Sequence, residues 1–260
     1  MLVWSGVLLY FYGSGRIANY LAPDFRIFTL LGGLGLAVLG WFNILTAGQT
    51  SACCHHQHGN GDSTHSGSDD MHPVTVVLLM LTPVALAVAW TKDEYSTTAL
   101  ARKGLYASPA SLSASFLKSD RPPLTLKEIE STHQMTDDGF LEFSLIELAF
   151  SSGDPEIQSL LEGLKVETEG RWVEEKFHNA EGTRKRLYRL LINCCAADIK
   201  AVPIVIDFGK KPTEFPEKSW VKVAGTLKFV LVDGTHHPVL DVNRADITEP
   251  PDEENLIRTP

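Results

Sequence analysis

Two runs of membrane length, both free of charged residues, constrain this chain more than any other feature of its sequence. Residues 27–45 read IFTLLGGLGLAVLGWFNIL and residues 73–90 read PVTVVLLMLTPVALAVAW. A helix needs about 20 mainly apolar residues to cross the ~30 Å hydrocarbon core of a bilayer. Pro83 would break a helix in water, whereas a membrane helix tolerates proline when neighbouring groups satisfy the freed carbonyl. Both runs are therefore predicted to be transmembrane helices, and a buried helix of a soluble core is the alternative.

The N-terminal stretch MLVWSGVLLYFY is apolar but gives way to Gly13-Ser14-Gly15-Arg16, which is too early for a full span. We interpret residues 1–15 as a shortened first transmembrane helix. Small residues around Gly33 and Ala37 give the second helix a face that a neighbouring helix can approach closely. Packing between the helices of this chain is the expected use of that face, and pairing with a second protein is the alternative.

The orientation follows from the basic residues in the short loops, because cytoplasmic loops are enriched in lysine and arginine. Arg16 and Arg26 lie between the first two apolar segments, and Arg102 and Lys103 follow the third, whereas residues 47–72 contain no lysine or arginine. The N-terminus and residues 47–72 are predicted to lie outside, and the C-terminal part in the cytoplasm. The expected location is the cell (inner or plasma) membrane, with several spans in the lipid bilayer.

The C-terminal half is predicted to be a soluble α+β or mainly β domain, an OB-like small barrel over residues 124–250. Residues 91–123 form a linker before it, and an acidic tail occupies residues 251–260. Within the domain, helices are expected over LTLKEIEST and over DPEIQSLLEG, where an aspartate cap precedes a proline. A strand is expected in GFLEFSLIELAF, from its alternation. Five longer strand-like runs follow: LKVETEGRWV, RLYRLLINCCAADI, VPIVIDFG, SWVKVAGTLKFV and HPVLDVNRADI. Five strands with one short helix favour the OB type of barrel, while a split sandwich and an irregular α+β domain stay open.

Residues 51–72, SACCHHQHGNGDSTHSGSDDMH, hold five of the nine histidines in the chain. Thiolate and neutral imidazole are the ligands that zinc and copper(I) prefer, so the loop is a candidate metal site. Glycines and serines between the donors predict a labile, exchangeable site, because a flexible loop loses entropy on binding. The alternative is a hydrophilic connector. The candidate ligands are Cys53, Cys54, His55, His56 and His58, with His65, His72, Asp69 and Asp70 as a second, harder set.

The second cysteine pair, Cys194-Cys195, falls in a strand-like run. Successive side chains of a strand point to opposite faces, so both thiols cannot easily bind one ion there. A turn at CCAAD would remove this objection and bring Asp198 close to one thiol, giving a possible second site of Cys194, Cys195 and Asp198. One buried and one exposed cysteine without a function is the alternative.

These blocks together resemble the YcgQ-like family of uncharacterised bacterial membrane proteins. The resemblance is carried by GSGRIANYLAPDFRIFTLLGGLGLAVLG, by TPVALAVAW and STTALARKG, and by Arg189 followed by NCCAADIKAVP with its CC-x-AD motif. WVKVAGTL and a late ITEP follow in the order of that family. The resemblance implies an accessory protein encoded beside a permease, with a link to metal handling and no established catalytic activity.

The net charge of −9 and the lack of a basic stripe exclude a nucleic-acid partner. No Gly-rich phosphate loop, nucleophile elbow or HExxH motif is present, so we do not expect an enzyme. The sequence therefore favours a membrane-anchored accessory of a permease system that handles zinc or copper. A membrane-anchored OB-like binding or sensing module without a metal role is the alternative, and a thiol-dependent enzyme is a third possibility.

Overall fold

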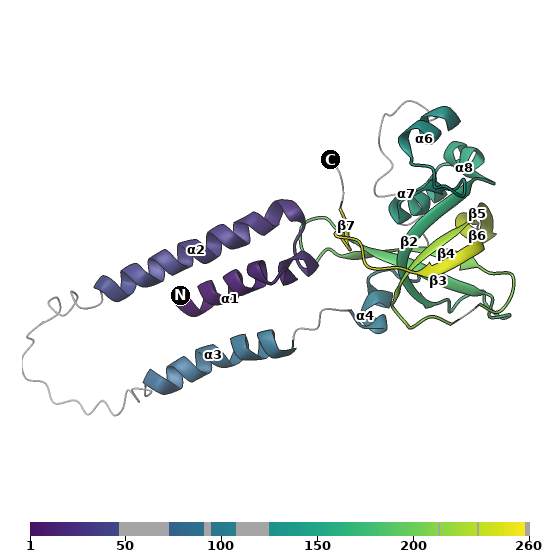
Figure 1. The fold of residues 1–260 in the computed structure, drawn as a ribbon. Helices are drawn as coiled ribbons and strands as arrows, with labels where there is room; N and C mark the ends of the chain where they lie inside the picture. Colours follow the sequence, from purple (N-terminus) through teal and green to yellow (C-terminus); the bar gives the residue numbers. More distant parts are fainter. Residues whose placement is uncertain (47–72, 91–94, 108–124, 213, 233, 258–260) are drawn as a thin grey trace, which may run out of the picture. The chain divides into compact units, whose positions relative to one another are not determined.

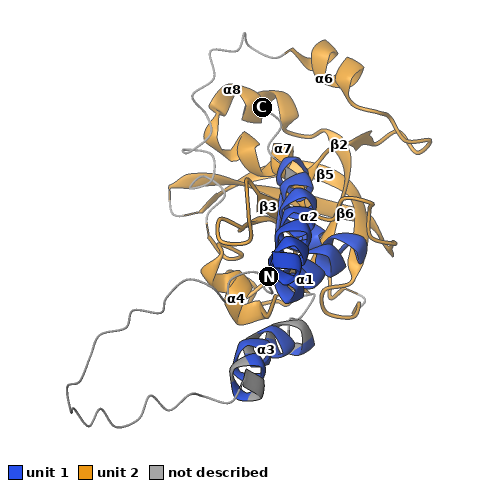
Figure 2. Ribbon diagram, turned by 90° about the vertical axis from the view of Figure 1, so that its left-hand side faces the viewer, with its two compact units in different colours: residues 1–94 blue, residues 95–260 orange. Residues whose placement is uncertain are grey.

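The computed structural model describes residues 1–46, 73–90, 95–107, 125–212, 214–232 and 234–257. The chain forms two compact units, Met1–Glu94 and Tyr95–Pro260 (Figure 2). The first unit is helical and the second is built around a β-sheet (Figure 1).

The first unit contains a helical hairpin of α1 (Leu2–Gly13) and α2 (Pro23–Thr46), joined through the short helix η1 (Arg16–Asn19). At 1.5 Å per residue, the 12 residues of α1 span about 18 Å and the 24 residues of α2 about 36 Å. Of these two helices, α2 alone is therefore long enough to cross a bilayer, in agreement with the predicted short first helix.

The small-residue face of α2 packs against α1. A Cβ atom added to Gly40 would lie 2.7 Å from Leu2, and one added to Gly33 would lie 3.0 Å from Leu9. The buried hydroxyl of Ser5 donates a hydrogen bond to the carbonyl oxygen of Gly33 at 2.7 Å. A Cβ atom on Gly35 would meet nothing within 4 Å. Close approach of the two helices thus accounts for Gly33 and Gly40.

Helix α3 (Pro73–Trp90) is the other apolar helix of this unit. Among the described residues, α2 is the one helix that is long and apolar enough to cross a membrane, while α1 and Val77–Leu86 are shorter apolar helices. The described structure supports one possible span, and the expected multi-pass arrangement is not supported by it.

Five long strands of the second unit close into a barrel. They are β2 (Lys165–Glu174), β3 (Arg184–Ile192), β4 (Lys200–Asp207), β5 (Trp220–Val232) and β6 (Thr235–Ile247). Their order is β2-β5-β6-β4-β3, and β3 pairs again with β2, which closes the sheet (Figure 1). Neighbours are antiparallel except β4 and β6, which are parallel. The five strands follow the five strand-like runs of the sequence.

Two short strands lie at the edges of this sheet. β1 (Leu141–Glu142) pairs in parallel with β2, and β7 (Leu256–Ile257) pairs in parallel with β3. The barrel is closed only where β2 and β3 pair directly, from Arg171↔Tyr188 to Glu174↔Lys185. Toward Lys165 of β2 and Ile192 of β3 the two strands diverge. There β1 pairs with the free edge of β2, and β7 pairs with the free edge of β3.

Helices α6 (Leu126–Thr132), α7 (Leu145–Phe150) and α8 (Pro155–Leu161) precede the long strands, with the short helix η2 (Ser151–Gly153) before α8. Figure 1 shows the three labelled helices gathered on one side of the sheet. The predictions of α6 and α8 are correct, including the cap at Asp154, whose carboxylate accepts hydrogen bonds from the amides of Glu156 and Ile157.

The expected strand in GFLEFSLIELAF is wrong beyond Glu142, because Ser144 begins a helix. The Ser144 hydroxyl accepts from the Glu147 amide, and the Glu147 carboxylate accepts from the Ser144 amide at 2.8 Å. This reciprocal cap fixes the first turn of α7, and Leu145, Leu148 and Ala149 are then all buried at helical spacing. The S-x-x-E pattern of Ser144 and Glu147 indicates this helix start in the sequence, whereas the alternation of apolar residues favours a strand.

The expected linker contains a packed segment. Ser96 caps α4 (Thr97–Arg102), and Leu100 and Leu105 are 1% and 0% exposed. Both pack with Val173, Tyr188 and Ala201 in a cluster on the barrel. Residues 95–107 therefore belong to the second unit, because their leucines are buried by tertiary contacts that local composition does not reveal.

The interior of the barrel is apolar. Trp172, Val221 and Val223 belong to the main core cluster, and Trp220 is 6% exposed. Trp172 packs edge-to-face against Phe208 and Phe215, with ring centroids 5.8 and 5.0 Å apart. Trp172 and Trp220 are thus both buried, and Val221 and Val223, two residues apart on β5, lie on the same face of that strand.

Candidate functional site

The first candidate metal site lies outside the described residues. Its predicted ligands are Cys53, Cys54, His55, His56, His58, His65 and His72, all within residues 47–72. The chemistry of this donor set, thiols and imidazoles, fits zinc or copper(I). The metal-binding loop therefore stays a prediction.

The second candidate site is a turn, and the interpretation of Cys194-Cys195 as part of a strand is wrong. β3 ends at Ile192, so both cysteines lie in the connection to β4. The Asp198 carboxylate accepts hydrogen bonds from the amides of Cys194, at 2.9 Å, and Cys195, at 3.4 Å. The alternative of a CCAAD turn that brings Asp198 to the cysteines is correct in its geometry.

The segment 95–107 forms hydrogen bonds with this turn and with the start of β4. Lys103 Nζ donates to the carbonyl oxygens of Ala197, at 2.9 Å, and Ala196, at 3.4 Å. The amide of Ala201 donates to the carbonyl oxygen of Lys103 at 2.9 Å. The sequence indicated Lys103 only as an orientation signal, and the structure shows that it holds the cysteine turn.

The chemistry of the Cys194 thiol is set by Asp198. Its hydrogen bond to the Asp198 carboxylate and a further one with Cys195 raise the pKa of Cys194 from 9.0 to about 11. Burial alone would raise the pKa of Asp198, but hydrogen bonds from Cys194 and the neighbouring amides hold it below its ordinary value. Both cysteines are free thiols. Because the thiolate is the nucleophile and the metal ligand, a raised pKa makes Cys194 a poor candidate for either role near neutral pH.

No group of three or more histidine, cysteine, aspartate or glutamate side chains is arranged to hold a metal ion in the part of the chain that the structure describes. At the cysteine turn, both oxygens of Asp198 already accept backbone amides. Cys194, Cys195 and Asp198 are brought together, but as a hydrogen-bonded turn.

A cationic site that the sequence did not indicate lies where β2 and β3 diverge. The guanidinium carbons of Arg171 and Arg189 lie 5.5 and 5.4 Å from the ring centroid of Trp220. We call Arg171, Arg189 and Trp220 the arginine–tryptophan corner. The carboxylate of Glu254 accepts from Arg171 at 2.7 Å, so the acidic segment near the C-terminus lies on this corner.

Other charged side chains of the barrel form neutralised groups. The buried Arg186 donates to Glu175 at 2.6 Å and to the carbonyl oxygen of Leu105 at 2.5 Å, which ties residues 95–107 to β3. Lys185 contacts the carboxylates of Glu174 and Glu214. Burial lowers the pKa of Lys185, but hydrogen bonds to these two carboxylates raise it above its ordinary value. These groups are satisfied structural pairs.

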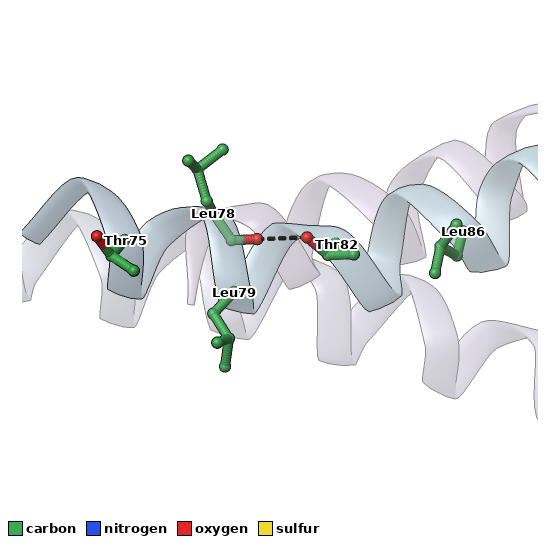
Figure 3. A pocket seen from close by; sticks show the side chains of 5 residues that line it. All are labelled: Thr75, Leu78, Leu79, Thr82 and Leu86. Atoms are coloured by element: carbon green, nitrogen blue, oxygen red, sulfur yellow. Dashed lines mark hydrogen bonds between the residues drawn. The ribbon is translucent and has the colours of Figure 1, made fainter. Parts of the chain in front are cut away.

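A shallow hollow follows one face of α3 (Figure 3). It is lined by Thr75, Leu78, Leu79, Thr82 and Leu86. The Thr82 hydroxyl donates to the carbonyl oxygen of Leu78 at 2.7 Å, within the helix itself. The hollow is an apolar helix face and does not gather polar groups for a ligand.

Comparison with known families finds a match, and it covers the barrel. Residues 158–255 match the DUF1980 C-terminal domain. The chain contains a DUF1980 C-terminal domain. The matched range takes in β2 to β6, the cysteine turn and the arginine–tryptophan corner, so these features lie within the DUF1980 C-terminal domain. The match carries neither the YcgQ-like name nor a CC-x-AD motif.

No curated protein matches the chain. A crystal structure of a DUF3299 family protein from Pseudomonas aeruginosa PAO1 matches 34% of this chain and 64% of that chain, at 13% sequence identity and a TM-score of 0.24. This chain therefore covers less than two thirds of that protein, and at such a TM-score the likeness carries no argument about fold or function.

Proposed function

We propose that this protein is a membrane-anchored binding module that serves as an accessory to a permease. The supporting observation is the exposed apolar surface of α2. Four of its large apolar side chains, Phe28, Val38, Trp41 and Phe42, are 63–68% exposed in the described structure. Contiguous apolar surface of this size marks a membrane or protein interface, and lipid is the partner that suits a 24-residue helix.

The barrel is the part of the protein that we propose to bind a partner. The strand order β2-β3-β4-β6-β5 with one parallel pair, β4 and β6, supports the assignment of this barrel to the OB type. Barrels of this type commonly bind extended ligands on the outer face of their strands. Association with a permease is supported by the family resemblance of the sequence.

Membrane anchoring and orientation are tested with a membrane-impermeant thiol reagent on intact cells. We expect Cys53 or Cys54 to be labelled, and Cys194 to be labelled only after permeabilisation and denaturation. Variants with either pair replaced by serine identify the labelled site. Recovery of the protein in the soluble fraction, or labelling of Cys194 in intact cells, would contradict this arrangement.

A second candidate function, reversible zinc or copper(I) binding, is supported by the density of thiols and imidazoles in residues 51–72. Ligands must lose their protons to bind, so metal affinity should fall as the pH drops through the imidazole range near ~6.5. Protein purified in mild detergent should carry metal, and a variant with Cys53, Cys54, His55 and His56 replaced should lose it.

The matched control for metal content replaces His65 and His72, which we expect to matter less because thiolates outcompete harder ligands for soft metals. Equal metal content in all three proteins would return the loop to a plain connector. That result would leave the anchoring proposal intact.

A further inference from the structure

The opening between β2 and β3 leaves two strand edges that short segments cover. Leu141 and Glu142 add to β2, and Leu256 and Ile257 add to β3. The pairing of β7 with β3 consists of two residue pairs, Leu191↔Leu256 and Ile192↔Ile257. A segment of two residues can form only a few of the backbone hydrogen bonds that an edge strand offers. β7 therefore covers only a small part of the β3 edge.

The arginine–tryptophan corner beside this edge is built to accept acidic chain. Arg189 lies between the core residues Leu187 and Leu191 on the same face of β3, and its side chain is 12% exposed. Burial lowers the pKa of Arg189 below its ordinary value, against the opposing effect of Glu169 and Glu254. A charged guanidinium that is largely buried destabilises the fold unless hydrogen-bond acceptors lie close to it.

Glu169 on β2 supplies one of those acceptors, with its carboxylate 3.8 Å from Arg189, and the segment 252–257 supplies the others. Arg189 donates to the carbonyl oxygens of Glu253, at 2.6 Å, and Glu254, at 3.3 Å. Arg171 donates to the Glu254 carboxylate at 2.7 Å, and the Glu254 side chain stays 38% exposed. Leu256, two residues on, is 8% exposed and joins the main core cluster. The occupant is thus a segment of adjacent acidic residues and one spacer, followed by two aliphatic residues that form the strand β7.

One donor at the corner has no acceptor. The indole Nε1 of Trp220 is buried and makes no hydrogen bond among the described residues. A buried donor without a partner costs about 1–3 kcal/mol. Residues 252–257 therefore leave this donor of the corner unsatisfied.

We propose that the arginine–tryptophan corner and the adjoining β3 edge are a docking site for an extended acidic segment of a partner protein, which residues 252–257 occupy in cis. Recognition combines strand addition to β3 with charge-assisted hydrogen bonds from Arg171 and Arg189. The partner displaces the segment of the chain itself and brings an acceptor to Trp220. This inference rests on the proposed binding role of the barrel and names the chemistry of its partner.

The test uses a fluorescein-labelled peptide with the sequence PPDEENLI, residues 250–257, followed by anisotropy. The peptide is titrated against the full chain in detergent and against a chain that ends at Glu249. Because the full chain carries its own occupant, we expect the shortened chain to bind the peptide at least tenfold more tightly. A peptide with glutamine in place of Asp252, Glu253 and Glu254 should bind at least tenfold more weakly than PPDEENLI.

Substitutions place the binding. In the shortened chain, Arg171→Gln and Arg189→Gln should each weaken binding of the peptide severalfold. Arg244→Gln is the matched control, because Arg244 is a barrel arginine that pairs with Glu167 and Asp138 and does not contact residues 252–257. Equal losses in all three variants would show general charge attraction and overturn the proposal.

A second variant covers the case in which the shortened chain does not fold. The full chain with Glu253→Gln and Glu254→Gln keeps every residue of β7 and should admit PPDEENLI more readily than the unchanged chain. The proposal is overturned if the neutral peptide binds as well as PPDEENLI, if no protein binds either peptide, or if the chains exchange their own segments and form dimers. Membrane anchoring and metal content are measured separately, so failure here is distinct from failure of the proposed function.

Discussion

Replacing Asp198 by asparagine should convert Cys194 from an unreactive thiol into an ordinary one. The Asp198 carboxylate is the largest influence on Cys194 and, with Cys195, raises its pKa from 9.0 to about 11. Asparagine keeps a side-chain oxygen that can accept one of the two backbone amides, but it carries no charge. The substitution therefore removes the main cause of the shift and keeps part of the turn.

The size of the effect follows from the proton equilibrium. At pH 8 a thiol with a pKa of about 11 is ionised in roughly one molecule in 1,000, and a thiol with a pKa of 9.0 in roughly one in ten. The full shift of 11 − 9.0 = 2 pKa units corresponds to a ~100-fold change in thiolate. Because Cys195 contributes part of the shift, we expect a ~10- to 100-fold increase in alkylation rate.

The assay is the pH dependence of alkylation by iodoacetamide, in a chain whose Cys53, Cys54 and Cys195 are replaced by serine. Asp154→Asn is the matched control, because Asp154 also accepts two backbone amides but lies at the start of α8. The midpoint for Cys194 should move toward 9 in Asp198→Asn and stay unchanged in Asp154→Asn. An unchanged midpoint in both variants would refute the reasoning about Asp198.

The same pair predicts how the turn responds to pH. The folded-state pKa of Cys194 is raised above its unfolded value, so the stabilisation is present below about pH 9 and is lost as the pH rises through about 11. The folded-state pKa of Asp198 is lowered, so its stabilisation is present above the ordinary aspartate pKa and is lost as the pH falls through the lowered value.

Three further predictions concern the fold. A soluble chain starting at Tyr95 should be more stable than one starting at Thr125 by roughly 3–6 kcal/mol, at 1.5–3 kcal/mol for each buried leucine, Leu100 and Leu105; equal urea midpoints would contradict this. Gly225→Ala should destabilise the barrel by ~3 kcal/mol or more, because its Cβ would lie 2.1 Å from the Asp241 carbonyl oxygen; thermal unfolding beside Thr226→Ala measures it. In the helical hairpin, Gly40→Val should weaken the α1–α2 contact at Leu2, whereas Gly35→Val should not; cross-linking of cysteines placed at positions 5 and 37 would show no difference if the reasoning is wrong.

The sequence by itself determined the features that depend on neighbours a few residues away. Alternation predicted the five long strands, the Asp154-Pro155 pair predicted α8, and the shortness of the first apolar run matches α1. The capping box at Ser144 was also present in the sequence, but the alternation of the preceding residues outweighed it. These signals are local because side-chain periodicity and helix caps arise within one or two turns of the chain.

Of the candidate sites, the cysteine turn was predictable from local sequence and the arginine–tryptophan corner was not. Residue type alone indicated Cys194, Cys195 and Asp198 as a group, and the CCAAD turn was one of two geometries left open. The arginine–tryptophan corner was not predictable, because Arg171, Arg189 and Trp220 come from three strands and meet only through the pairing of β2 with β5 and β3.

Tertiary structure alone decided the closure of the barrel, the burial of residues 95–107 and the place of the acidic segment. Each depends on which strand edges and apolar faces meet, and such contacts join residues far apart in the chain. Glu254 and Arg171 are 83 residues apart, and Lys103 and Ala197 are 94 apart. A strand carries the same pattern of side chains whichever neighbour it pairs with, so its sequence fixes which face is buried but leaves its partner to the fold.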